Sequence, residues 1–197
     1  MKKLLVSLLS VFCFASFSVA GDWGAGVKLG VGQNDPKSLN EAFDYLGGEL
    51  TEGDGVFGLE VLHEWHLNDD INKLGVKVGL DVYGENEWKN SYYHTVTETI
   101  YSFPITLYYK QDYGVKNWSW FAGAGISFMK GEVEEGPDTY KKNTVFPHIT
   151  AGAEYRFTDL FALGLDLKYN INAELKKGGY KSDRSGLSGA LTARFYF

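Results

Sequence analysis

The residues best suited to chemistry in this chain are a pair of carboxylates. Glu60 and Glu64 stand four positions apart in "FGLEVLHEWHL", so both lie on one face if the segment is a strand. Two carboxylates can act as general acid and general base when a substrate fits between them. Their role therefore depends on the elements that carry them and on the room that those elements leave.

The histidines and the single cysteine are weaker candidates for catalysis or metal binding. "FPHITAGAE" places His148 two positions before Thr150, and a histidine base could activate a threonine nucleophile. A hydrogen-bonded interior histidine is the alternative. His63 and His66 would face opposite sides of a strand, so the spacing does not support a metal site. The single cysteine, Cys13, lies in the N-terminal apolar run, so we expect no disulfide or thiol nucleophile, and we expect no cofactor.

Apolar and polar residues alternate with a period of two in eight segments, which is typical of strands with one apolar face. In "WGAGVKLGV", for example, Trp23, Val27 and Leu29 alternate with glycines and Lys28. The eight predicted strands cover residues 23–31, 57–67, 74–83, 96–109, 118–128, 145–157, 161–171 and 186–197. Each has roughly the ten residues that a tilted strand needs to cross a bilayer. The pattern predicts an all-β, eight-stranded antiparallel up-and-down transmembrane barrel.

The N-terminus reads as an export signal. Lys2 and Lys3 precede an apolar run from Leu4 to Phe17 and a small-residue cleavage site ending at Ala20. We expect residues 1–20 to be a signal peptide and residues 21–197 to form the barrel domain. Of 19 basic and 25 acidic residues, the signal removes two lysines, which leaves a formal charge of −8. This acidic balance argues against nucleic acid as a partner.

The connections alternate between short and long. The short ones are "NDDINK", "KQDYGVKN" and "TDL", and the long ones cover residues 34–54, 84–95, 131–144 and 172–185. Short periplasmic turns and longer outer loops are expected of such barrels. A soluble barrel of the lipocalin type, with its apolar face inside, is the competing interpretation. Two features favour the membrane barrel: a glycine-rich polar face, and aromatic residues at strand ends on the apolar face, namely Trp23, Trp65, Tyr109, Trp118, Tyr155, Phe161, Phe195 and Phe197.

The segments "FPITLYYK", "FAGAGISF", "AGAEYRFTDLFALGLDLKY" and "LSGALTARFYF" resemble small outer membrane barrels of Gram-negative bacteria, the group that contains the OmpA transmembrane domain and OmpX. The resemblance implies location in the cell outer membrane, contact with its lipid and lipopolysaccharide, and assembly by the outer-membrane insertion machinery. A last strand that ends in phenylalanine resembles the signal which that machinery reads. Here those residues are Leu191, Phe195, Tyr196 and Phe197.

If the apolar face meets lipid, the other face must pack inside. The expected interior polar network has both signs of charge and consists of Lys28, Glu60, Glu64, Lys77, Asp81, Glu154, Arg156, Asp166, Lys168 and Arg194. Because eight strands enclose only enough room for side chains, we expect a salt-bridged plug with no substrate site between Glu60 and Glu64. We therefore expect no catalytic residues and no metal.

The loops are the expected place of specificity. "SLNEAFDYL" could form a short amphipathic helix capped by Ser38 or Asn40, and "KGEVEEGPDTYKKN" looks like an extended hairpin turning at Gly136 and Pro137. The basic residues expected to contact lipopolysaccharide phosphates are Lys176, Lys177, Lys181 and Arg184.

The sequence thus predicts a monomeric, non-enzymatic barrel with a structural or surface-interaction role, whose loops could bind an extracellular ligand or host protein. A narrow channel for small solutes is one alternative. An outer membrane lipid A-modifying enzyme is another, since "FPHITAGAE" loosely resembles the His-x-Ser segment of lipid A deacylases.

Overall fold

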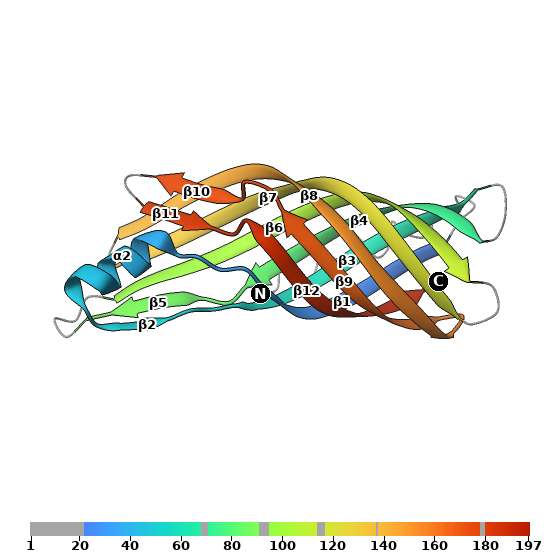
Figure 1. Cartoon of the computed structure of the whole chain (residues 1–197), viewed down its shortest axis with the longest axis horizontal. Helices are drawn as coiled ribbons and strands as arrows, with labels where there is room; N and C mark the ends of the chain where they lie inside the picture. The colour runs from blue at the N-terminus through green and yellow to red at the C-terminus, as the bar shows by residue number, and fades with distance from the viewer. Residues whose placement is uncertain (1–21, 68–70, 91–94, 114–116, 137, 178–179) are drawn as a thin grey trace.

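The computed structural model describes residues 22–67, 71–90, 95–113, 117–136, 138–177 and 180–197. The predicted signal peptide lies outside the described residues and stays a prediction. Within the described chain, eight long strands form the body of the molecule (Figure 1): β1 (Asp22–Gly32), β3 (Gly55–His66), β4 (Asn72–Tyr83), β6 (Thr95–Tyr113), β7 (Trp118–Glu135), β8 (Asp138–Thr158), β9 (Phe161–Asn170) and β12 (Gly186–Tyr196).

These strands close into a ring. Each pairs antiparallel with its neighbours in the order β1, β3, β4, β6, β7, β8, β9, β12, and β12 returns to β1 through pairs that run from Gly24↔Tyr196 to Gly32↔Ser188. The predicted eight-stranded up-and-down barrel is confirmed. A closed ring satisfies the backbone hydrogen bonds of every strand, which a sheet in lipid requires.

The two faces of the wall carry opposite chemistry. On the outside, Leu29 is 65% exposed and Leu191 is 71% exposed, whereas inside, Glu64 and Asp81 are each 1% exposed. An apolar exterior around a charged interior is the arrangement of a membrane barrel. It is the reverse of a lipocalin, so the soluble alternative is wrong.

Aromatic side chains surround one end of the barrel, the end with the short turns and the C-terminus. The rings of Trp118 and Tyr155 lie 5.1 Å apart, and those of Phe161 and Phe195 also lie 5.1 Å apart. The eight aromatic residues predicted for strand ends gather at this single end. Since outer membrane barrels turn briefly on the periplasmic side, this end is periplasmic.

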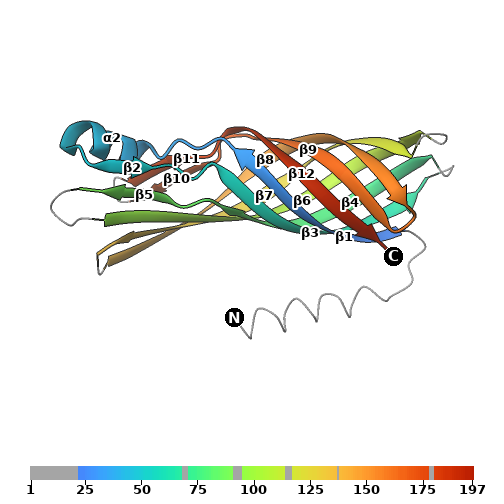
Figure 2. The same ribbon diagram turned by 90° about the horizontal axis from the view of Figure 1, so that it is seen from below.

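The other, extracellular end is extended (Figures 1 and 2). Strands β6, β7 and β8 have 19, 18 and 21 residues, against 10 to 12 in the other barrel strands, and run on beyond the ring. The helix α2 (Lys37–Leu46) and the short strands β2 (Glu49–Thr51), β5 (Asn86–Lys89), β10 (Glu174–Lys177) and β11 (Tyr180–Asp183) lie at the same end. Strands β2 and β5 add to β6, and β10 and β11 form a separate hairpin.

The predicted loop helix is confirmed, but its predicted caps are wrong. Pro36 occupies the N-cap position of α2, and no side chain caps the helix. Ser38 instead accepts a hydrogen bond from the Lys181 backbone N–H at 2.6 Å. Among the described residues no helix is long and apolar enough to cross a membrane.

The predicted hairpin in the third long connection is confirmed as the paired extension of β7 and β8, which reaches Glu135↔Asp138. Gly136 at its tip has a φ of 57°, which suits glycine, and Pro137 lies outside the described residues.

Candidate functional sites in the lumen and at its mouth

The periplasmic half of the lumen is filled by ion pairs centred on Arg194. This guanidinium on β12 reaches Glu60 at 2.6 Å, Glu154 at 3.0 Å and Asp166 at 2.7 Å. Arg194 is 3% exposed, and its three partners come from β3, β8 and β9. One cation therefore ties together strands on several sides of the ring.

Lys110 forms a second centre. Its ammonium group lies 3.2 Å from Glu64 and 2.8 Å from Glu154, and it donates to the Tyr196 hydroxyl at 3.0 Å. Tyr108 donates to Glu64 at 2.8 Å. Glu154 joins the two centres, because Arg194 and Lys110 both contact it.

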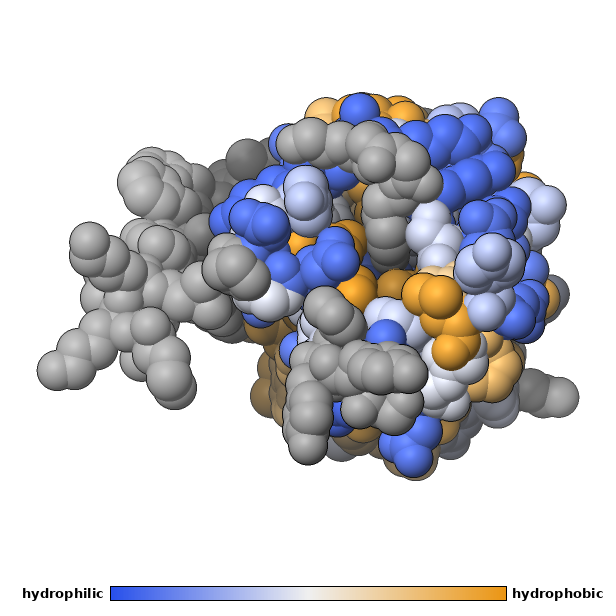
Figure 3. Space-filling view, turned by 90° about the vertical axis from the view of Figure 1, so that its left-hand side faces the viewer, coloured by the Kyte–Doolittle hydropathy of each residue, from blue (hydrophilic) through white to orange (hydrophobic). Residues whose placement is uncertain are grey.

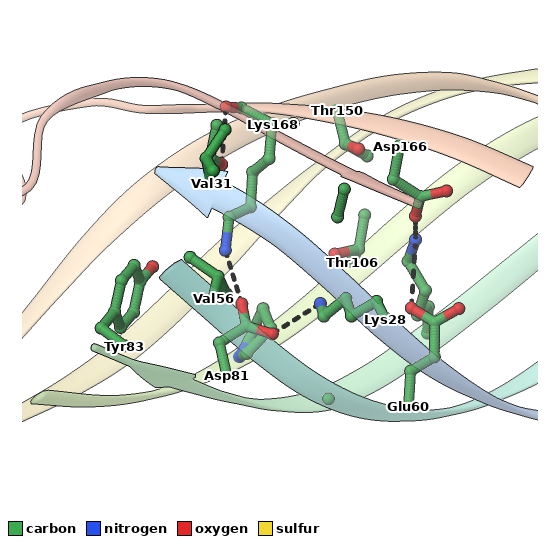
Figure 4. Close-up of a pocket in the computed structure, with 16 residues that line it drawn as sticks. Lys28, Val31, Val56, Glu60, Asp81, Tyr83, Thr106, Thr150, Asp166 and Lys168 are labelled. Atoms are coloured by element: carbon green, nitrogen blue, oxygen red, sulfur yellow. Dashed lines mark hydrogen bonds and ion pairs between the residues drawn. The ribbon is translucent and has the colours of Figure 1, made fainter. Parts of the chain in front are cut away.

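A third group lies toward the extracellular side (Figure 4). Asp81 contacts Lys28 at 2.6 Å and Lys168 at 2.7 Å, and Lys77 contacts Asp166 at 2.8 Å and Glu60 at 3.6 Å. Each charge in these three groups thus has a partner of opposite sign, which a low-dielectric interior requires.

The ten residues predicted for the interior network all lie on strands of the ring, and nine of them make the ion pairs above. Arg156 stacks over the Tyr196 ring at 4.1 Å instead. Glu60 meets Lys77 as expected from adjacent strands, but Glu64 meets Lys110 and, at 3.8 Å, Lys73.

Lys73 and Lys110 are two interior charges that the sequence analysis did not place inside the barrel. They were assigned to the short turns, whereas the structure extends β4 and β6 to include them. Carrying the alternation one residue beyond each predicted strand would have found them, since Gly75 and Tyr108 share their faces.

His148 lies within hydrogen-bond distance of two hydroxyls that are not Thr150. Its Nε2 is 2.8 Å from Thr106 Oγ1, and its Nδ1 is 2.9 Å from Ser127 Oγ. Thr150 donates to the Leu167 carbonyl at 2.8 Å. The histidine is 2% exposed inside the barrel, so the geometry gives no base-to-nucleophile contact between His148 and Thr150.

His63 and His66 lie on opposite faces, as predicted. The His63 ring packs on the outer face between Trp23 and Trp65, 4.4 Å from each, while His66 lies 3.6 Å from Asp22. Within the described part of the chain, no group of three or more histidine or acidic side chains is arranged to hold a metal.

Little space remains between the charged groups. A cavity of about 40 Å³ lies among Lys28, Lys77, Asp81, Asp166 and Lys168, and a second of about 10 Å³ lies beside Arg194 and Lys110. The larger one has room for a few water molecules.

An apolar cluster lies on the extracellular side of this cavity. It is made of buried side chains from the wall and from the β10 segment, namely Tyr83, Ile100, Met129, Phe146, Ala173 and Leu175. Leu175 fits against Gly131, where an added Cβ would lie only 2.6 Å from the leucine Cδ1. Seen from the extracellular end, hydrophilic residues border much of the rim and hydrophobic ones show between them (Figure 3).

The basic residues of the fourth long connection do not share one environment. Arg184 is 1% exposed and its guanidinium lies 5.2 Å from the Tyr83 ring centre. The prediction that Arg184 contacts lipopolysaccharide is therefore wrong, because this side chain, just after β11, is buried beside Tyr83. Lys176 and Lys181 lie nearer the surface and pair with Glu174, and the Lys177 side chain lies outside the described residues.

The last strand divides its aromatic residues between the two faces. Phe195 and Phe197 are each 56% exposed on the outside with Leu191, whereas Tyr196 is 4% exposed and donates to Glu154. Phe197 exchanges backbone hydrogen bonds with Trp23, at 2.8 and 3.3 Å, where β12 closes on β1.

A closed ring with an apolar exterior, a periplasmic aromatic belt and an ion-paired lumen defines a transmembrane β-barrel of the Gram-negative outer membrane. The chain belongs to the family described as outer membrane protein beta-barrel domain, whose profile matches residues 4–195. A comparison with curated proteins gives no match.

Several solved structures share this fold. Neisserial surface protein A is 17% identical, with a TM-score of 0.56, over 90% of this chain and 96% of that one. OprG of Pseudomonas aeruginosa is 10% identical, with a TM-score of 0.58, over 90% and 96%. Ail, the attachment invasion locus protein of Yersinia pestis, in complex with the heparin analogue sucrose octasulfate, is 11% identical, with a TM-score of 0.53, over 91% and 100%.

Proposed function

We propose that this outer membrane barrel is a monomeric, non-enzymatic surface protein whose extracellular sheet binds an external partner. The observation that carries the proposal is the extension of β6, β7 and β8 beyond the ring, with β5 and β2 added at one side. A scaffold that serves the membrane alone does not need this additional sheet.

The sheet has two open edges. Strand β2 pairs with β5 alone, and over residues 138–146 β8 pairs with β7 alone before β9 joins it at His148. Open edges present unpaired backbone donors and acceptors, which can pair with an extended segment of another chain.

A basic groove beside the β8 edge indicates an anionic component in the partner. Lys141, Lys142 and Lys176 line this groove together with Glu98 and apolar residues such as Val133 and Leu175. Lys141 also pairs with Glu132, and Lys176 with Glu174. The three lysines stand out on a chain whose formal charge is −6. The similarity in fold to Ail, which was crystallised with a heparin analogue, makes a sulfated polysaccharide a suitable first probe.

The test is adhesion of cells that display the chain to heparin-coated surfaces. We expect replacement of Lys141, Lys142 and Lys176 by glutamine to abolish adhesion, while Lys89→Gln, an exposed lysine on β5, leaves it unchanged. A second variant replaces residues 132–141 by Asn-Gly to remove the hairpin tip. Equal adhesion by the shortened variant would contradict the proposal.

Contact with lipopolysaccharide stays a proposal for Lys176, Lys177 and Lys181. The exposed position of Lys176 on the β10–β11 hairpin supports it. Co-purification of lipopolysaccharide with the wild-type chain, compared with a variant in which the three lysines are glutamine, tests this contact.

The two other candidate functions have less support. A channel needs an open lumen, whereas the lumen cavities have volumes of about 40 and 10 Å³ and ion pairs fill the space between them. A lipid A-modifying enzyme needs a nucleophile that lipid can reach, whereas the two hydroxyls beside His148, those of Thr106 and Ser127, are buried inside the barrel. Conductance in planar bilayers and the lipid A profile of expressing cells would decide between these functions.

A further inference from the structure

The lipid-facing surface of β7 ends at a lysine. From Trp118 to Phe128, the outward side chains of this strand are aromatic, aliphatic or alanine. This stretch has about the 9–11 residues that a tilted strand needs to cross the hydrocarbon core of a bilayer. Lys130 is the next outward residue, with 43% of its side chain exposed. It therefore lies at the level of the lipid head groups of the outer leaflet.

Two hydrogen-bond donors flank this lysine at the same level. Lys130 pairs with Tyr101 of β6 on one side and with Asn143 of β8 on the other. Both neighbours lie on the outer face, because Phe103 and Val145, two positions nearer the bilayer centre on the same strands, are 47% and 58% exposed. A phenol, an ammonium and an amide group thus form one outward row, called here the donor row, directly above an apolar row.

A second lysine reaches the donor row from the next outward row. Lys141 of β8 pairs with Glu132 of β7, one outward row further from the membrane. Lys130 Nζ and Lys141 Nζ lie 2.5 and 3.4 Å from the same carboxylate oxygen, Glu132 Oε1. The hydrogen bond from Lys130 lowers the pKa of Glu132, so this carboxylate is ionised at neutral pH. Two ammonium groups share one negative charge, which leaves one positive charge in surplus.

The pair of Lys89 and Glu87 on β5 gives a contrast. These residues are also two positions apart on a strand, and Lys89 Nζ lies 2.8 Å from Glu87 Oε2. One lysine meets one glutamate in this pair, so its charges balance. Lys89 pairs with Thr95, the first residue of β6, so it lies at the extracellular tip of the sheet and remote from the apolar row. Surplus charge and closeness to lipid are thus combined at Lys130 and not at Lys89.

The donor row has the chemistry that a phosphate group needs. Phosphate oxygens accept hydrogen bonds from ammonium, phenol and amide groups, and those from a charged donor are the stronger ones. The exposed side chains of Phe103, Phe128 and Val145 directly below offer a surface to acyl chains. A soluble anion would gain nothing from this apolar row, and a lipid with an uncharged head group would gain nothing from the surplus charge.

We propose that the donor row and Lys141 bind the phosphate of a single lipid molecule of the outer leaflet, whose acyl chains lie against the apolar row below. Glu132 competes with the phosphate for both lysines and so limits the affinity. The site is separate from the basic groove beside β10, because of its four residues Lys141 alone lines that groove.

The first test is a titration of the folded chain with lipid A, a phosphorylated lipid, followed by native mass spectrometry. We expect one molecule of lipid A to bind saturably. Lys130→Gln should bind it about fivefold more weakly, and Lys130→Gln with Lys141→Gln about thirtyfold, the sizes expected of one and two lysines at the surface of a membrane. The matched control, Lys89→Gln, should bind like the wild type.

Glu132→Gln tests the shared carboxylate and should have the opposite effect. Without its negative charge both lysines are left to the phosphate, so we expect tighter binding of lipid A. Glu87→Gln, the matched control on β5, should leave binding unchanged. If a divalent cation bridged Glu132 and the phosphate instead, Glu132→Gln would weaken binding, and that result would overturn the proposal.

Two further ligands separate the phosphate from the acyl chains. Dephosphorylated lipid A should bind the wild type no better than lipid A binds the double variant, and glucosamine phosphate without acyl chains should not bind at concentrations that saturate with lipid A. Heat-dependent gel migration checks that each variant is folded. The proposal is also overturned if lipid A does not bind saturably, if either of these ligands binds as tightly as lipid A, or if Lys89→Gln loses as much binding as Lys130→Gln.

Discussion

The periplasmic and extracellular halves of the lumen are filled by different chemistry. In the periplasmic half, strand side chains such as Arg194, Glu154 and Lys110 meet across the ring as ion pairs. At the extracellular mouth, beyond the ion pairs of Asp81, Leu175 of the β10–β11 hairpin lies in an apolar cluster with Ile100 and Met129. The first half is filled by side chains of the wall itself, and the mouth by a segment folded into it.

The two halves should respond differently to the loss of a side chain. A buried ion pair that loses one partner leaves a charge without compensation, which is strongly destabilising. An apolar layer that loses one side chain leaves a cavity, and its loss stays local because the hairpin contributes no strand to the ring. Variants of the ionic half should therefore destabilise the whole barrel strongly, whereas variants of the apolar half should have a smaller effect that stays local.

The largest effect is expected at the ionic centre. Arg194→Met leaves Glu60, Glu154 and Asp166 short of a cation, and we expect a loss of about 3–5 kcal/mol in the free energy of unfolding. Urea titration in detergent measures it. Lys141→Met, a 57% exposed site on the hairpin, is the control and should change stability by less than about 0.5 kcal/mol. Similar midpoints for both variants would show that the ionic half is not what holds the barrel.

The apolar half should give a smaller and local effect. Leu175→Ala opens a cavity in the layer above the lumen, and we expect the hairpin to lose about 2 kcal/mol of local stability. Limited proteolysis at the hairpin should accelerate while the urea midpoint of the barrel stays unchanged. Leu46→Ala on α2, where the leucine is 62% exposed, serves as the control. A fall in the barrel midpoint equal to that of Arg194→Met would remove the distinction between the halves.

The end of the last strand should affect assembly more than stability. We propose that Leu191, Phe195, Tyr196 and Phe197 are read during insertion, and the exposed position of Phe197 beside the closing β1 strand supports this. Phe197→Ala should lower the amount of assembled protein in cells while refolding into detergent proceeds normally. Phe157→Ala removes an aromatic with 53% exposure from the same end and should assemble normally. Equal assembly of both variants would contradict the insertion role.

The smallest effect is expected from pH at the mouth. Burial would raise the pKa of Asp183, but hydrogen bonds from Ser185 and Lys37 outweigh it and hold this pKa below its ordinary value. The hydrogen bond to Asp183 raises the pKa of Lys37. Because the carboxyl pKa is lowered by folding, its stabilising effect is present above about pH 4 and is lost as the pH falls through the lowered value.

The pKa of Lys37 shifts in the opposite direction, because folding raises it. The stabilisation that Lys37 gives the folded state is therefore complete below its ordinary pKa and is lost only as the pH rises through the raised pKa. The contact between α2 and β11 should therefore hold at neutral pH and loosen in acid. Amide exchange at Lys181, whose N–H donates to Ser38, would report it. Asp183→Asn should remove the acid transition in the amide exchange of Lys181. An unchanged transition in that variant would show that another group titrates.

Much of the barrel could be predicted because one face of each strand had to be apolar. The alternation of Trp23, Val27 and Leu29 with Lys28 determined both the strand and its orientation. The pairing of Glu60 with Lys77 followed from adjacent strands. Lys110 was missed because it lies one residue beyond the predicted strand, in what reads as a short turn, whereas β6 continues to Tyr113.

The sequence by itself determined eight strands, their apolar outer faces and a charged interior, since these follow from a period of two along the chain. Only the tertiary structure decided which charges meet, because closure brings together residues such as Lys168 and Asp81, which are 87 positions apart. It also decided that Arg184, just after β11, is buried beside Tyr83. Partner choice across a closed ring depends on the tilt and stagger of all eight strands, and no local pattern encodes these.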